Sequence, residues 1–151
     1  MRLHYLMLFL HLLGVVVWVG GMTFAYLCLR PALGSLPPPQ RLTVMAGALG
    51  RFFTLVWAAV GCILVSGPAM LLEAGVRQAP PAWHVMLLTG LVMMGVFLSI
   101  WLGPWPKLEA ALRREDWAAG AAALAVIRQR VGFNLVLGLL TMAAATLGLG
   151  L

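Results

Sequence analysis

The sequence predicts an all-α membrane protein, folded as a bundle of four transmembrane helices. Of its 151 residues, 63% are hydrophobic and only 9% are charged, whereas roughly a quarter of a soluble domain is charged. Four apolar stretches are long enough to cross a bilayer, which takes about 20 helical residues. Most basic residues lie between these stretches rather than within them. We therefore expect one transmembrane domain over residues 1–151.

Proline, glycine and charged residues mark the ends of the predicted spans. The first span ends at Arg30-Pro31, and the third is closed by Pro104. Residues 31–50 are predicted to form a loop, because Pro37-Pro38-Pro39 is incompatible with a helix interior. Residues 107–128 show helical amphipathicity, which predicts a helix lying at the membrane surface; a solvated connector is the alternative. The predicted spans cover about residues 8–30, 51–73, 83–103 and 131–150.

The distribution of charge predicts the orientation in the membrane. The chain has ten Lys and Arg residues against four acidic ones, a net charge of +6. Eight of the ten lie in or beside the 31–50 loop and the 107–128 connector, while Arg2 and Arg77 lie on the other side. Cytoplasmic loops are enriched in Lys and Arg, so we expect both termini in the periplasm and a multi-pass inner-membrane protein. Trp101 and Trp105 would mark the cytoplasmic membrane interface. The positive charge is thus assigned to orientation rather than to nucleic-acid binding.

One face of the first span carries histidine and methionine. An ionisable side chain inside a membrane span is costly, so it is a candidate functional residue by default. The alternative is a helix that packs on its neighbours, with its outermost histidine reaching water and its methionines filling gaps. By helical spacing, this face comprises His4, Met7, His11, Gly14, Trp18 and Met22.

A second histidine is predicted to lie at the depth of His11. His11 and His84 are each about 20 residues from the inner end of their spans, and both spans run from outside to inside. Their imidazoles should therefore lie at one level near the periplasmic face, within about 1.5 Å along the membrane normal. We expect them to hold a common metal, with His4, Met7 and Met86 as further candidate ligands. An interfacial position beside Trp83 is the alternative for His84.

The donor set leaves two cofactors open. Imidazole with thioether suits copper, especially Cu(I), and Met70 near the end of the second span is a further thioether. Imidazole with imidazole or methionine suits haem b equally well. Small residues near this level, such as Gly14 and Gly67, permit close helix packing and would also leave room for a macrocycle.

Several enzyme classes are excluded. The sequence has no glycine-rich phosphate loop and no Cys-x-x-Cys motif. Glu73 marks the interfacial end of the second span, so no carboxylate is available for acid–base chemistry within the spans, and Ser66 and Ser99 have no evident base partner. Hydrolysis is therefore not expected, and any enzymatic activity would be redox chemistry carried by a cofactor.

The first span resembles a known family. His11-Leu-Leu-Gly-Val-Val-Val-Trp18-Val-Gly-Gly21 is similar to the opening helix of the copper-resistance D (CopD) family of bacterial inner-membrane proteins. Arg51-Phe52-Phe53, followed by Val65-Ser66-Gly67, resembles the second helix of that family. The spacing in the first span also resembles that of HemJ, a haem-binding membrane protein. The resemblance implies that His11 is a metal or haem ligand, with Trp18 and Gly21 as packing neighbours.

These observations give three functional hypotheses. The preferred one is copper binding or uptake through a His/Met site near the periplasmic face. The second is a b-type haem protein with bis-His or His/Met ligation, and the third is a cofactor-free membrane subunit or scaffold. The expected partners are the lipid bilayer, a periplasmic copper or electron donor, and a second copy or another membrane subunit, but not nucleic acid.

Overall fold

The structure is a computed structural model that describes residues 2–147, and this part of the chain is helical apart from short connections. Its four long helical segments are apolar enough to span a membrane, which confirms the predicted architecture. The last predicted residues of the fourth span, 148–150, lie outside the described part. The segments are Arg2–Ala32, Pro38–Ala74, Pro81–Arg113 and Trp117–Thr146.

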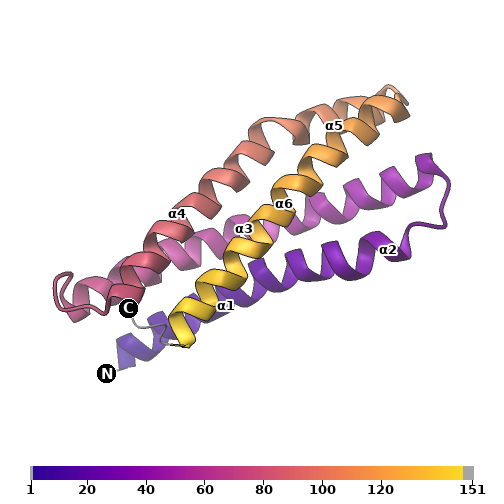
Figure 1. The fold of residues 1–151 in the computed structure, drawn as a ribbon. Helices are drawn as coiled ribbons and strands as arrows, with labels where there is room; N and C mark the ends of the chain where they lie inside the picture. The colour runs from indigo at the N-terminus through magenta and orange to yellow at the C-terminus, as the bar shows by residue number, and fades with distance from the viewer. Residues whose placement is uncertain (1, 148–151) are drawn as a thin grey trace.

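The long segments form two antiparallel helix pairs (Figure 1). Helix α1 packs along α3, and α4 packs along α6. One end of the bundle holds all three histidines, where α1 begins, α3 ends and α4 begins; we call it the histidine end. The opposite end holds the α2–α3 loop and the α5–α6 turn; we call it the basic end. The elements are α1 (Arg2–Thr23), the π-helical η1 (Phe24–Leu29), α2 (Arg30–Ala32), α3 (Pro38–Ala74), α4 (Pro81–Leu102), α5 (Pro104–Arg113) and α6 (Trp117–Thr146).

The predicted loop over residues 31–50 is wrong in extent. Helix α3 begins at Pro38, so only residues 33–37 lie outside helices. Pro38 and Pro39 occupy the first turn of α3, where backbone N–H groups have no intrahelical partner in any case. The proline run therefore starts this helix instead of preventing it.

The segment predicted as one surface helix over residues 107–128 is divided in two. Helix α5 ends at Arg113, and Glu115 adopts a positive φ of 54°. Asp116 then caps α6, because its carboxylate accepts a hydrogen bond from the Ala119 N–H at 3.0 Å. The two halves fold back on each other and bury Leu108 and Ile127 between helices. The amphipathic pattern thus reflects packing against protein, which hydrophobic periodicity alone does not distinguish from packing against lipid.

The core lies in the middle of the bundle and toward the basic end. Phe53 packs edge-to-face on Trp105, with ring centroids 5.0 Å apart, and Trp105 stacks on Trp101. Trp105 is only 7% exposed, so its ring is part of the protein core. Its position at the cytoplasmic membrane interface stays a prediction. In α4 the buried residues are Met93, Phe97 and Ile100. The part of α4 before Met93 therefore contributes no buried side chain, and the histidine end is the less tightly packed end.

Asn134 links α6 to α4 by a hydrogen bond inside the apolar core. Its side-chain Nδ2 donates a hydrogen bond to the Met93 carbonyl oxygen at 3.0 Å, and the residue is 1% exposed. Closer to the histidine end, the Thr141 hydroxyl donates a second hydrogen bond between these helices, to the Thr89 hydroxyl at 2.9 Å. These polar contacts hold the α4–α6 pair together where lipid offers no hydrogen-bond partners.

Candidate metal site

The three histidines at the histidine end have different partners. His11 Nδ1 lies 3.1 Å from the Ser66 hydroxyl oxygen, and His4 Nδ1 lies 2.9 Å from a carboxylate oxygen of Glu73. Both bonds join α1 to α3. His84 instead donates from Nε2 to the Val76 carbonyl oxygen, 3.0 Å away in the loop before α4. His4 and His11 therefore face one helix interface, whereas His84 is held by its own loop.

Hydrogen bonding around Ser66 fixes the tautomer of His11. The Ser66 hydroxyl donates to the Cys62 carbonyl oxygen at 2.6 Å, and Ser66 is fully buried. With its only proton used in this way, the Ser66 oxygen can only accept from His11. Nδ1 of His11 therefore carries the proton, and Nε2 carries a lone pair with no hydrogen-bond partner among residues 2–147. Metal-binding histidines are typically oriented like this, by a hydrogen bond from the nitrogen that does not bind the metal.

His4 is oriented in the same way by an acidic group. The Glu73 carboxylate accepts from Nδ1, so Nε2 of His4 is left free to bind an ion. The two side chains are 39% and 54% exposed, respectively, so water reaches this pair. Each histidine of α1 thus has one nitrogen fixed by α3 and one nitrogen available.

The two hydrogen bonds set the register between α1 and α3. His4 and His11 are seven residues apart, and so are their partners Ser66 and Glu73. Met7 lies three residues after His4, and Met70 lies three residues before Glu73. In an antiparallel pair this places the two methionines at the same level, between the two histidines. Both are half-buried, so the interface carries the order histidine, methionine pair, histidine.

Glycines bring α1 and α3 together below this level. A Cβ on Gly14 would lie 2.9 Å from the Ala59 carbonyl oxygen, so only glycine fits there without movement of the helices. A Cβ on Gly67 would lie 3.4 Å from Cε1 of the His11 ring, which therefore rests against the glycine on α3. Trp18, one turn below Gly14, is buried edge-to-face on Phe97 with centroids 6.3 Å apart. Gly14 and Trp18 thus form the packed floor beneath the histidines rather than a ligand cavity.

The structure gives His11 and His84 no common hydrogen-bond partner. His84 is exposed, and α4 packs mainly along α6, not along α1. Met86 is half-buried on the same helix as His84. Within residues 2–147, no three His, Cys, Asp or Glu side chains cluster as a metal-binding group. Binding of one ion by His11 and His84 together stays a prediction.

Residues 46–147 match the sequence model of a protein family, described as copper resistance protein D (CopD). The chain belongs to the CopD family. No curated protein and no solved structure matches the chain. Membership gives this four-helix protein a membrane function related to copper resistance and places it, as predicted, in the inner membrane as a multi-pass protein.

The family match includes the second-span motifs noted in the sequence, Arg51-Phe52-Phe53 and Val65-Ser66-Gly67, but not the His11–Gly21 motif of the first span. It covers most of α3 and the helices from α4 to α6, and begins after α1. The family match therefore says nothing about His11, whose role in this CopD-family protein is inferred from its hydrogen bonds and its position in the structure. The likeness of the first span to HemJ remains a resemblance.

Two residues that contact the histidines had no assigned role in the sequence analysis. Ser66 was expected to have no base partner; His11 lies 3.1 Å away, but it donates its Nδ1 proton to Ser66 and so does not act as a base toward it. Ser66 is not placed to act as a nucleophile, because its hydroxyl donates a hydrogen bond to the Cys62 carbonyl oxygen and its side chain is buried. Glu73 was interpreted only as the end of a span. The signal for both was their seven-residue spacing, which matches that of His4 and His11.

Proposed function

We propose that this CopD-family protein binds Cu(I) at the histidine end, between α1 and α3, and handles it as cargo. The ligands are the free imidazole nitrogens of His4 and His11 and the thioethers of Met7 and Met70, a set that we call the Met/His stripe. The observation that carries the proposal is the hydrogen-bond chain from His11 Nδ1 through Ser66 to the Cys62 carbonyl, which leaves Nε2 of His11 without a partner, in register with the two methionines.

The chemistry of the Met/His stripe favours a soft monovalent ion. Imidazole and thioether are neutral donors, and Cu(I) prefers them to carboxylates. His4 and His11 are seven residues apart, or about 10.5 Å along the helix, so a single ion does not bind both. Each histidine together with the methionine pair offers a separate set of donors. An ion can therefore move from His4 to His11 by exchanging one imidazole for the other while the thioethers retain it.

The orientation that the charge distribution predicts is compatible with this direction of movement. Lys and Arg residues concentrate at the basic end, which the positive-inside rule assigns to the cytoplasm. The histidine end then faces the periplasm, with the exposed His4–Glu73 pair outermost. A periplasmic copper donor would meet His4 first and His11 second.

Close packing of α1 and α3 favours an ion over haem b. At Gly14 the helices are so close that even a Cβ would meet the Ala59 backbone. A macrocycle beside His11 requires these helices to separate, whereas a metal ion needs only the donor atoms. We therefore place copper handling ahead of haem binding and of a cofactor-free scaffold.

The test is Cu(I) binding by the purified protein in detergent, measured anaerobically by competition with a chromophoric chelator. We expect at least about one Cu(I) per chain. Replacing Met7 and Met70 together with leucine should weaken binding by about tenfold or more, a loss of at least ~1.4 kcal/mol. The matched control replaces Met86 and Met142, which lie on α4 and α6, and should leave the affinity unchanged.

Other outcomes would contradict copper handling. A protein that takes up no Cu(I) but shows a Soret band near ~410–430 nm after haem supplementation is a haem protein. A protein that binds neither ligand is a scaffold. Equal losses in the two methionine variants would place the copper outside the Met/His stripe.

A further inference from the structure

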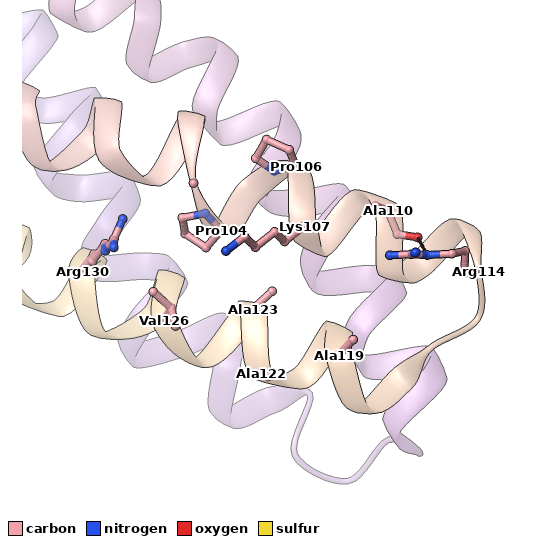
Figure 2. Close-up of a pocket in the computed structure, with 11 residues that line it drawn as sticks. Pro104, Pro106, Lys107, Ala110, Arg114, Ala119, Ala122, Ala123, Val126 and Arg130 are labelled. Atoms are coloured by element: carbon pink, nitrogen blue, oxygen red, sulfur yellow. Dashed lines mark hydrogen bonds between the residues drawn. The ribbon is translucent and has the colours of Figure 1, made fainter.

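A second candidate binding site lies at the basic end, far along the bundle from the histidines. A groove of about 750 Å³ runs between α5 and the first half of α6. Figure 2 shows three basic side chains along it, with Arg114 near the turn, Lys107 in the middle and Arg130 at the other end. The rest of the lining is apolar or small, and no acidic residue contributes to it. These other residues are Gly103, Pro104, Pro106, Ala110, Ala119, Ala122, Ala123 and Val126.

Arg130 is held in place without being neutralised. One guanidinium nitrogen, Nη1, donates to the Ser99 carbonyl oxygen at 2.7 Å and lies 3.1 Å from the Ser99 hydroxyl. Both partners are uncharged, and the remaining N–H groups of Arg130 stay available. A Cβ on Gly103 would lie 3.5 Å from Nη1, so the glycine between α4 and α5 leaves the guanidinium uncovered on that side.

The other two cations are also without acidic partners. Arg114 donates from Nε to the Ala110 carbonyl oxygen at 3.3 Å, again a neutral group. Among residues 2–147 no Lys or Arg side chain forms a salt bridge with an acidic group, and the one histidine–carboxylate contact, His4–Glu73, lies at the opposite end of the bundle. Asp116, close to Arg114 in sequence, is occupied in capping α6. The groove is therefore lined by three positively charged side chains that have no acidic partner.

We propose that this groove binds the headgroup of an acidic phospholipid. The phosphate lies between Lys107 and Arg130, since Figure 2 shows the Lys107 ammonium pointing along the groove toward Arg130. Arginine and lysine are the usual partners of phosphate oxygens in proteins, and basic pockets beside membrane helices on the cytoplasmic side recognise anionic lipids. The charge of the groove is complementary to such a headgroup.

The position and the walls of the groove favour a lipid over a free phosphate ion. Arg130 is the last charged residue of α6 before its apolar run from Val131 onward, so we expect it to lie at the level where headgroups meet acyl chains. The alanine and valine side chains of α6 that line the groove offer an apolar surface to glycerol and acyl carbons. Its volume of about 750 Å³ also suits a ligand larger than phosphate.

The experiment compares lipid binding by two doubly substituted full-length proteins with equal loss of charge. Lys107→Gln/Arg130→Gln removes two cations of the groove, and Arg113→Gln/Arg128→Gln removes two exposed cations of the same helices outside it. Binding of phosphatidylglycerol and phosphatidylcholine is measured by native mass spectrometry from detergent, and sodium phosphate is tested separately as a competitor. We expect the first variant to bind phosphatidylglycerol about tenfold more weakly and the second less than about twofold.

A third variant keeps every charge. Ala122→Phe places a large side chain in the groove, and it should also weaken phosphatidylglycerol binding while leaving Cu(I) binding at the histidine end unchanged. Circular dichroism confirms that each variant is folded. Equal losses in the two charge variants, equal binding of the two lipids, or complete competition by millimolar phosphate would each overturn the proposal.

Discussion

Replacing His11 with alanine is expected to lower the Cu(I) affinity of the purified protein by about 100-fold, the largest effect of any single substitution considered. His11 supplies a donor nitrogen whose orientation is fixed by a fully buried partner, Ser66, whereas the partner of His4, Glu73, is 54% exposed. Its loss leaves the inner set of donors with thioethers alone. The measurement is the anaerobic chelator competition used for the parent protein.

Ser66→Ala separates the orienting role from ligation. This change keeps the imidazole but removes the acceptor that holds the proton on Nδ1, and loss of such a partner typically costs about 10–100-fold in metal affinity. The matched control is His84→Ala, which removes an exposed imidazole bonded only to the Val76 carbonyl. A His84→Ala loss as large as that of His11→Ala would instead support a site shared by the two helices.

Gly14→Ala is expected to destabilise the protein by about 1–3 kcal/mol, the cost of overpacking a close contact. The added methyl group would lie 2.9 Å from the Ala59 carbonyl oxygen and 2.8 Å from a side-chain carbon of Ile63. The side chain can rotate away, but the backbone oxygen cannot, so α1 and α3 must move apart. Because Gly14 lies one turn below His11, Cu(I) affinity should fall together with the melting temperature.

Gly20→Ala is the control for this prediction. No atom lies within 4 Å of a Cβ at Gly20, so alanine should be neutral or stabilise the helix by up to ~1 kcal/mol. Thermal unfolding in detergent distinguishes the two variants. If Gly14→Ala melts at or above the temperature of Gly20→Ala, the close approach of α1 and α3 is not present in the protein.

Hydropathy predicted the transmembrane helices well, because crossing a bilayer requires a long apolar stretch whatever the tertiary packing of the helices. The four spans follow from the length of apolar sequence alone, and the structure confirms all four in the part of the chain that it describes. Helix ends were less predictable. Pro38 and Pro39 are compatible with a first helical turn, and Asp116 is compatible with a cap, but only within a helix whose start is already known.

Only part of the candidate site could be predicted, because the sequence gives the depth of a residue in its helix but not the direction of its side chain. Counting residues gives the depth of His11 and His84 but not the direction in which each ring points around its helix axis. The structure directs His11 to Ser66 and directs His84 to Val76. The stripe on α1 was visible from helical spacing, whereas its partners on α3 depend on the register of an antiparallel pair.

The central claim, that imidazole and thioether groups of α1 and α3 hold Cu(I) together, is tested most directly by X-ray absorption at the copper edge. Protein loaded with one equivalent of Cu(I) is compared with the Met7→Leu/Met70→Leu protein loaded in the same way. We expect both imidazole nitrogen and sulfur around copper in the parent protein, with the sulfur contribution lost in the variant. A copper environment of nitrogen and oxygen alone in the parent, or sulfur that persists in the variant, would contradict the claim.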